Sequence, residues 1–312
     1  MIFLLLYLYI AKMLDKNMCR RWDGSPALPY FKSSDLGIEE KRFSFKSGKN
    51  ALYGSKYFKK GVIYRDLVVF FHGLGAGRNA YMKEISEFVK HGYFVYAYDY
   101  TGCMESEGNN IIGLGQPLKD VECFFEYLDT DENAKGLNRY AVGHSWGGYV
   151  ASYSISNDKF EIKKAVSMAG FLKPEDQYYD LAPQLKKFKI FLRLYFKNRL
   201  KNYGNVDVKQ IIKNTKVPFL YVQGIQDKTV PYKNNGKAIE ELSRENKSIK
   251  TKIFEHRGHN IHMSNEAENY CASLLNEGLN KPNNKPELAM DIQKATVEDP
   301  RVMKCIFDFL TS

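Results

Sequence analysis

The chain alternates short apolar runs with amphipathic stretches from Leu67 onwards, and this alternation restricts the fold more than any other feature of the sequence. Short β-branched and aromatic runs are typical of buried strands, whereas apolar residues repeated with the period of an α-helix indicate helices. The pattern therefore predicts an α/β fold with a mostly parallel sheet covered by helices on both faces, and ligands bind beyond the carboxyl ends of such strands. The expected strands are 41–45, 51–58, 67–71, 94–98, 139–144, 164–169, 218–223 and 250–255, of which the first two form an antiparallel edge, and the expected helices are 79–91, 116–128, 146–156, 233–244 and 301–310.

Two segments break this alternation. Residues 171–215 carry no strand pattern and are rich in aromatic and basic side chains, which predicts a helical lid insertion, and 276–299 form a second, polar stretch. The chain therefore divides into an N-terminal extension (1–40), a core (41–170 and 216–312) and the lid. The apolar face of the lid is expected to line an acyl pocket or touch a membrane surface, or else to pack on the core through Phe188, Phe191, Leu192 and Phe196.

The segment YAVGHSWGGYV places Ser145 between a strand and a helix in the pattern GxSxG. A serine in that context occupies a sharp turn that exposes its hydroxyl, and side chains in place of Gly143 and Gly147 would collide with the adjoining strand and helix. The hydroxyl becomes a good nucleophile only when a base removes its proton and a carboxylate orients that base. The sequence thus predicts that Ser145 is a nucleophile with two partners elsewhere in the chain.

The two partners are expected after later strands. Asp227 follows the strand in PFLYVQG, and His259 follows the strand in KTKIFEH, which gives the chain order Ser, Asp, His. As alternatives, Asp227 would only cap the helix after Pro231, and His256 or His262 would be the base. His256 still belongs to the strand and His262 lies further along the chain, so His259 is the favoured base.

The stretch VVFFHGLGAGRN brings three glycines into a turn between a strand and a helix. Such a loop binds either the phosphates of a dinucleotide or the oxyanion of an acyl-transfer intermediate. A dinucleotide fingerprint needs GxGxxG and an acidic residue about 20 positions on, for which Asp99 would serve, but Arg78 occupies the third glycine position. With a serine nucleophile in the chain, an oxyanion loop explains the pattern better, and its donors would be the backbone amides of Leu74 and Trp146.

Five motifs in this order resemble the α/β-hydrolase superfamily, specifically its branch of esterases, monoacylglycerol lipases and serine aminopeptidase-like enzymes. They are HGLG, YDYTGCMESEG, GHSWGG, the QD of QGIQDKTVP, and GHN, and the resemblance covers residues 41–262. In this family the second motif, DxxGxGxSxG, is usually structural. Asp99, Gly102, Ser106 and Gly108 match it, whereas Met104 replaces the middle glycine, which puts the local backbone of that loop in doubt. The resemblance implies the α/β-hydrolase fold and makes Asp99 an organiser of the loop.

The resemblance also implies a mechanism. Ser145 would attack the carbonyl of a small-molecule ester, His259 would transfer the proton, and Asp227 would orient the imidazole. The amides of Leu74 and Trp146 would hold the oxyanion, without any metal or organic cofactor. An acyl-glycerol or another lipid-like ester is one candidate substrate. A peptidase or an acyltransferase on the same triad is the enzymatic alternative, and a catalytically silent binding protein is the non-enzymatic one.

Composition bears on partners and compartment. The 312 residues include 46 basic and 36 acidic side chains, and the net charge of +10 suits either an anionic partner or an ordinary lysine-rich surface. No nucleic-acid motif accompanies the charge, so no nucleic-acid partner is expected. The five cysteines follow neither metal nor disulfide spacing, which favours a reducing, cytoplasmic compartment.

The first residues, MIFLLLYLYIAK, contain an apolar run of about ten residues, shorter than the roughly 20 that span a bilayer. The run lacks the basic region and the cleavage site of a signal peptide. Three alternatives stay open: weak contact with a membrane surface, to which the basic lid would add; a strand or helix packed on the domain; or a translation start at Met13 or Met18. Membrane association through this run is the alternative to a purely cytoplasmic location.

Overall fold

The central sheet of the protein contains eight strands in the order β1-β2-β4-β3-β5-β6-β7-β8. In the computed structural model, which describes residues 2–25, 27–279 and 290–312, β1 pairs with β2 and β2 with β4 in antiparallel fashion, and the remaining neighbours are parallel. This arrangement confirms the predicted mostly parallel sheet with an antiparallel edge. The strands are β1 (Glu39–Ser47), β2 (Asn50–Phe58), β3 (Asp66–Phe71), β4 (Tyr93–Tyr98), β5 (Asn138–His144), β6 (Ile162–Met168), β7 (Phe219–Gly224) and β8 (Ile249–Phe254).

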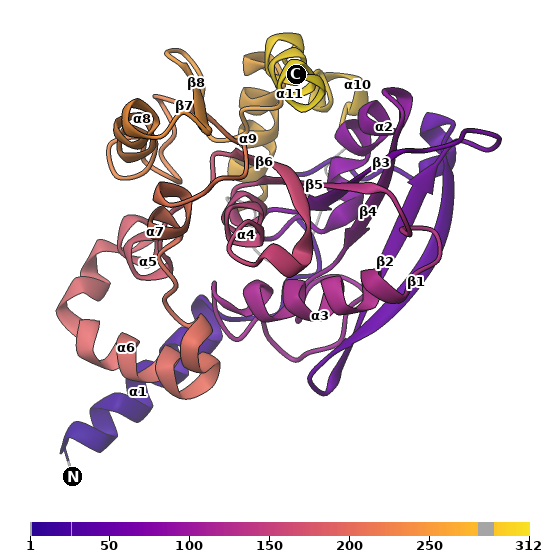
Figure 1. Cartoon of the computed structure of the whole chain (residues 1–312). Helices are drawn as coiled ribbons and strands as arrows, with labels where there is room; N and C mark the ends of the chain where they lie inside the picture. Colours follow the sequence, from indigo (N-terminus) through magenta and orange to yellow (C-terminus); the bar gives the residue numbers. More distant parts are fainter. Residues whose placement is uncertain (1, 26, 280–289) are drawn as a thin grey trace.

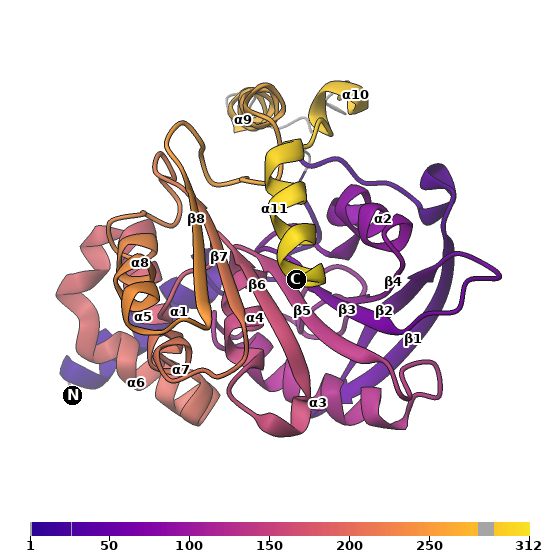
Figure 2. The same ribbon diagram turned by 45° about the horizontal axis from the view of Figure 1, so that its top comes forward.

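Helices cover both faces of this sheet (Figure 2). One apolar core lies between the sheet and α3 (Gln116–Thr130), α4 (Trp146–Ser154) and α8 (Gly236–Glu245). A second core lies on the opposite face, under α2 (Met82–Lys90) and α11 (Pro300–Thr311). Strand β3 contributes alternate side chains to the two cores, because successive residues of a strand point to opposite faces. A strand buried on both sides must be apolar throughout, which is why the run in β3 shows no polar alternation.

The insertion after β6 is helical, as the sequence predicts. It contains α5 (Pro174–Leu181), α6 (Lys189–Leu200) and α7 (Val208–Lys213), together with the 3₁₀ turns η4 (Pro183–Phe188) and η5 (Lys201–Tyr203). Leu192 and Phe196 are buried in the first core, and Phe188 and Phe191 pack partly against it. Much of the apolar content of α6 is therefore used for packing on the domain.

The N-terminal extension folds as a helix, α1 (Ile2–Asn17), followed by a 3₁₀ turn, η1 (Ser33–Leu36). Ile10 and Leu14 of α1 are buried in the first core, and α1 contacts α6 at one corner of the molecule (Figure 1). Of the three alternatives for this segment, the structure agrees with a helix packed on the domain. None of the helices in residues 2–25, 27–279 and 290–312 is long and apolar enough to cross a membrane.

The element boundaries differ from the sequence expectations in a few places. The helix expected at 79–91 begins with a 3₁₀ turn, η2 (Arg78–Tyr81), and only then continues as α2, and a further 3₁₀ turn, η3 (Asp158–Phe160), precedes β6. The polar stretch 276–299 is not simply a loop, because α9 (Asn265–Leu279) enters it and α10 (Ile292–Ala295) lies within it. Its middle part, 280–289, lies outside the described residues. Apolar contacts between α9 and α10 form a small third cluster, which polar composition does not reveal.

Candidate active site

Ser145 occupies a sharp turn between β5 and α4. Its φ of 56° and ψ of −115° lie in a region that non-glycine residues rarely adopt, and its amide donates to the carbonyl of Met168 at 2.7 Å. A Cβ on Gly143 would overlap the backbone of Gly147, and a Cβ on Gly147 would overlap the carbonyl of Phe71 in β3. The two glycines of the GxSxG pattern are therefore required by close backbone approach, as the sequence predicts.

Three side chains meet at this turn. The Nε2 of His259 lies 2.8 Å from the Oγ of Ser145, and its Nδ1 lies 2.8 Å from the Oδ2 of Asp227. A carboxylate oxygen accepts, so the Nδ1–H of His259 donates to Asp227 and leaves the Nε2 lone pair facing the serine hydroxyl. The arrangement is chemically suited to remove the hydroxyl proton during attack on a carbonyl.

The structure brings together Ser145, Asp227 and His259 rather than the alternative residues. His256 is exposed beside Glu255, and His262 is buried with its Nε2 3.5 Å from Glu84. Asp227 does not cap the helix after Pro231, because α8 begins at Gly236 with Asn235 at its N-cap. Its Oδ1 instead accepts the amides of Thr229 and Val230, each at 2.8 Å, while its Oδ2 accepts from His259. One carboxylate thus organises the turn and orients the histidine at the same time.

The glycine loop after β3 approaches the same turn. A Cβ on Gly73 would lie 3.5 Å from the carbonyl oxygen of His144, the residue before Ser145. Gly75 and Gly77 have φ angles of 78° and 74°, which glycine adopts without strain. This loop carries Leu74, while Trp146 is the first residue of α4, so both predicted oxyanion donors belong to segments that flank Ser145.

His144 joins the serine turn to the histidine loop, a role that sequence reasoning missed. Its Nε2 lies 2.9 Å from the carbonyl oxygen of His259, and its Nδ1 lies 2.8 Å from the hydroxyl of Tyr81. Burial, together with the nearby His259, lowers the pKa of His144 to about 3, so the ring is neutral. A neutral imidazole can donate to the His259 carbonyl and accept from Tyr81. His144 occupies the first unspecified position of GxSxG, so the motif itself gives no signal for this contact.

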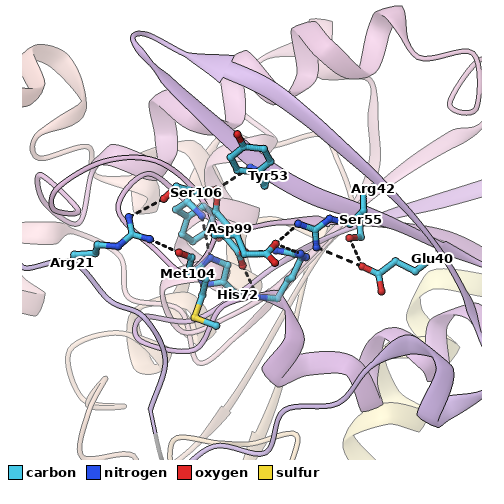
Figure 3. A network of polar contacts seen from close by, with 12 residues as sticks. Arg21, Glu40, Arg42, Tyr53, Ser55, His72, Asp99, Met104 and Ser106 are labelled. Atoms are coloured by element: carbon cyan, nitrogen blue, oxygen red, sulfur yellow. Dashed lines mark hydrogen bonds and ion pairs between the residues drawn. The ribbon is translucent and has the colours of Figure 1, made fainter.

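Asp99 organises the loops beside the site. Its Oδ1 accepts the amide of Arg78 at 2.9 Å, its Oδ2 pairs with the guanidinium of Arg78, and both side chains are 1% exposed. Ser106 donates to the Asp99 carbonyl at 2.5 Å and accepts the amide of Tyr53, which attaches the loop after β4 to β2 (Figure 3). The aspartate that would have bound a ribose is therefore an internal partner of the glycine loop. The sequence showed Arg78 only as the residue that replaces the third glycine of a dinucleotide fingerprint, and it did not predict the pairing of Arg78 with Asp99.

Met104, which replaces a glycine of the family motif, adopts a φ of 47°. The N-terminal extension supports this strained position: Arg21 donates to the carbonyls of Met104 and Ser106, and the Met104 amide donates to the carbonyl of Trp22 at 2.8 Å (Figure 3). The loop thus keeps its conformation without glycine because residues outside the family motif hold its backbone.

A buried acidic pair lies behind His144, next to His262. Burial and the nearby Glu298 raise the pKa of Glu84, and burial raises the pKa of Glu298 to about 7. The ring of His262 lies 4.6 Å from that of His144, and burial lowers the pKa of His262. Glu84, Glu298 and His262 all line a small cavity of about 30 Å³. Burial thus favours the neutral form of both carboxyls.

The partly buried Glu298 should make stability depend on pH. In the unfolded chain its pKa is about 4.5, whereas in the folded protein it is about 7, so the carboxyl favours the folded state fully below pH 4.5 and loses this contribution as the pH rises through 7. Glu298→Gln stays uncharged at every pH. Between pH 4.5 and pH 8 we expect the free energy of unfolding of the variant to gain about 3 kcal/mol relative to wild type. Urea unfolding at both pH values measures this difference. Glu132→Gln, which changes an exposed glutamate, should run parallel to wild type, and parallel curves for Glu298→Gln would contradict the assignment.

Glu175 of the lid is engaged by other lid residues. Its carboxylate accepts from Arg193 at 3.0 Å, from the hydroxyl of Tyr179 at 2.8 Å and from the amide side chain of Asn205 at 3.0 Å. A cavity of about 280 Å³ between α5, α6 and η5 has Glu175 and Arg193 in its wall, and no residue of the Ser145 site lines it. No group of three or more metal-binding side chains suited to an ion occurs within residues 2–25, 27–279 and 290–312.

Comparison with known proteins places this architecture. The family model "Serine aminopeptidase, S33" matches residues 64–216. An esterase of Pyrococcus furiosus superposes with a TM-score of 0.62 at 19% identity, covering 82% of this chain and 96% of that protein. An acylaminoacyl peptidase of Pyrococcus horikoshii superposes with a TM-score of 0.58 at 19% identity, covering 83% of this chain and 44% of the peptidase. These likenesses at low identity establish the fold.

The matches to relatives found by sequence cover shorter parts of the chain. Two Arabidopsis thaliana proteins, provisionally named chloroplastic methylesterases 15 and 13, are 32% identical over 134 residues and 36% identical over 100 residues. The matches cover 38% and 31% of this chain, and the chain spans only 29% and 21% of the length of these relatives. The sheet order, the serine turn and these comparisons define the α/β-hydrolase fold. The chain therefore has the α/β-hydrolase fold that its sequence motifs imply, and residues 64–216 are similar to the serine aminopeptidase family.

Proposed function

We propose that the protein hydrolyses a small-molecule carboxylic ester through an acyl-enzyme on Ser145. The observation that carries the proposal is the continuous chain of hydrogen bonds from Ser145 through His259 to Asp227, with 2.8 Å at each step. The methylesterase names of the sequence relatives and the esterase among the structural neighbours support an ester as the substrate.

Each step follows from the positions of these side chains. Ser145 Oγ attacks the ester carbonyl while its proton passes to Nε2 of His259, and the amides of Leu74 and Trp146 hold the resulting oxyanion. His259 then gives the proton to the departing alcohol, which leaves the acyl group on the serine. Water attacks this acyl-enzyme with His259 again as the base, and the acid is released.

Residues 171–215 act as the lid in this proposal. Leu114 links the lid to the serine turn through two hydrogen bonds. Its carbonyl accepts from the indole N–H of Trp146 at 2.8 Å, and its amide donates to the hydroxyl of Tyr178 in α5 at 2.8 Å. In addition, the hydroxyl of Tyr149 in α4 donates to the carbonyl of Val206 at 3.1 Å. A substrate that displaces the lid would therefore act directly on segments next to Ser145.

A peptidase that recognises a free amino terminus is less well supported. Such an enzyme needs an available carboxylate for the substrate ammonium, and the acidic candidates at the start of the lid are Glu175 and Asp176. Arg193 neutralises Glu175, and Arg193, Tyr179 and Asn205 occupy its oxygens. Because the Glu175 carboxylate already has these partners, an ester is favoured over a peptide with a free amino terminus. An acyltransferase, which passes the acyl group to an acceptor other than water, would use the same triad.

The compartment follows from cysteine chemistry in this proposal. Cys19, Cys103, Cys123, Cys271 and Cys305 are all free thiols, and burial raises the pKa of each of them, which keeps them protonated and unreactive. Free thiols are typical of a reducing compartment. We therefore place the protein in the cytoplasm.

Labelling with a fluorophosphonate probe tests the proposed function directly. The probe reacts with an activated serine, so we expect one modified peptide, containing Ser145, after mass mapping of the wild-type protein. Ser145→Ala should not be labelled. Ser156→Ala, which changes an exposed serine just beyond α4, should be labelled like wild type. A folded wild-type protein that resists the probe would overturn the proposal and favour a binding role.

A further inference from the structure

Helix α1 presents an uncharged, solvent-exposed end. Its buried side chains, Ile10 and Leu14, occur in its second half, whereas no residue from Ile2 to Ala11 carries a charge. The side chains that are 37–71% exposed in this first half are Phe3, Leu4, Leu5, Leu6, Leu8 and Tyr9. So many adjacent exposed apolar residues are unusual on a soluble domain and mark a surface that contacts another phase or partner.

The exposed side of α1 changes character along the helix. Leu5, Leu8 and Tyr9 are followed on the same side by Lys12 and Lys16, because residues three or four apart share a helix face. Both lysines are exposed. One face of α1 is thus apolar at its beginning and cationic at its end.

The neighbouring lid segment is strongly basic. From Ala182 to Lys201 the chain contains seven lysines and arginines and no acidic residue. All seven are exposed, and Ile190 between them is 62% exposed. They are Lys186, Lys187, Lys189, Arg193, Lys197, Arg199 and Lys201.

The two segments form one surface. The rings of Phe3 and Phe191 lie 4.8 Å apart, and Asp15 pairs with Arg199 at 2.6 Å, so α1 and α6 run side by side along their lengths. Both ribbon views show the two helices together at one corner, with the N-terminal end of α1 pointing away from the sheet (Figures 1 and 2). The contact at Phe191 places the apolar end of α1 next to the part of the lid that carries Lys187 and Lys189.

The geometry points to an anionic lipid bilayer as the partner of this α1–α6 surface. Apolar side chains beside lysines and arginines match the acyl boundary and the negative head groups of such a bilayer. Arg193 and Arg199 pair with Glu175 and Asp15, but a second copy of the chain would still bring the five lysines of this lid segment towards one another. A nucleic acid would leave the exposed leucines in water. With 16 residues α1 is about 24 Å long, less than the ~30 Å of a hydrocarbon core, so it lies in the interface.

Flotation with lipid vesicles tests this inference independently of catalysis. The Ser145→Ala protein with all 312 residues is mixed with vesicles of phosphatidylcholine alone or of phosphatidylcholine with an equal amount of phosphatidylglycerol. We expect flotation with the anionic vesicles only, and less of it at high salt, because salt screens the head groups. Because the serine is absent, failure of the hydrolase proposal cannot change this result.

Two variants probe the two components of the surface. Leu5→Ser/Leu8→Ser removes exposed apolar area, and Lys186→Gln/Lys187→Gln/Lys189→Gln removes three cations. Each should weaken binding to anionic vesicles at least tenfold, since one basic residue near such a surface contributes about fivefold. The matched controls change the exposed loop between β2 and β3: Ile63→Ser for the apolar change and Lys59→Gln/Lys60→Gln for the charge change. Both controls should bind like the parent protein.

The outcomes separate the occupants of the surface. No flotation of the parent protein, or equal flotation of all variants, overturns the inference. A parent protein that is dimeric by light scattering and becomes monomeric with Leu5→Ser/Leu8→Ser, while vesicle binding stays unchanged, assigns the surface to a second copy and also overturns it. Thermal melts of the variants check that they are folded, and the lysine variant alters only exposed side chains.

Discussion

Ser145→Ala and His259→Ala are each expected to lower kcat/KM for an ester substrate by a factor of about 10⁴ or more. Without the hydroxyl no acyl-enzyme forms, and without the imidazole the hydroxyl keeps its proton. Because the two residues act as a unit, the double variant should be hardly slower than either single variant. Steady-state rates with p-nitrophenyl esters of increasing acyl length provide the measurement and also define the preferred chain.

Asp227→Asn should be less severe and leave a small residual rate. An asparagine in that position no longer favours the tautomer in which Nε2 faces the serine, but the imidazole and the hydroxyl both remain. The rate left should exceed that of Ser145→Ala by about tenfold to a hundredfold. Circular dichroism spectra that match wild type would show that the losses are chemical. Substantial turnover by a folded Ser145→Ala protein would sink the proposed mechanism.

Much of the fold could be predicted because the strands are buried on both faces. In residues 67–71 of β3 and in β4, burial on both sides leaves only apolar, β-branched and aromatic residues as suitable choices, so these runs are visible in the sequence alone. The serine turn was predictable for a different reason: close backbone approach at Gly143 and Gly147 permits only glycine, and the resulting pattern is short and local.

The rest depends on contacts between residues far apart in the chain. Helix α9 packs Ala267 and Cys271 against Ala295 of α10. The polar composition of the segment between the two helices does not predict this contact. The contact of His144 with the carbonyl of His259 joins residues that are 115 positions apart, and a backbone acceptor leaves no mark on the sequence. The position of Asp227 and His259 was inferable only because the carboxyl ends of parallel strands meet at one edge of the sheet.

The buried pair of Arg78 and Asp99 is expected to have a large effect on the free energy of unfolding. Arg78→Met leaves the carboxylate of Asp99 buried without its partner, and we expect the free energy of unfolding to fall by about 3–5 kcal/mol. Burial already raises the pKa of Asp99, and loss of the guanidinium should raise it further. A carboxyl with a raised native pKa contributes stability at low pH that is lost as the pH rises, so the damage should be smaller at pH 5 than at pH 8.

A double-mutant cycle distinguishes the buried pair from simple loss of packing. Arg78→Met/Asp99→Asn removes both charges and should be more stable than Arg78→Met alone, because no unpaired carboxylate remains. The matched control is Arg42→Met, which changes an exposed partner of the same Glu105 and should cost about 0–1 kcal/mol. If Arg78→Met were no more damaging than Arg42→Met by urea unfolding, the assigned role would be wrong. The Arg78 guanidinium pairs with Asp99 at the end of the loop that carries Leu74. We therefore also expect a folded Arg78→Met protein to lose kcat more than substrate affinity, which a destabilised but intact site would not do.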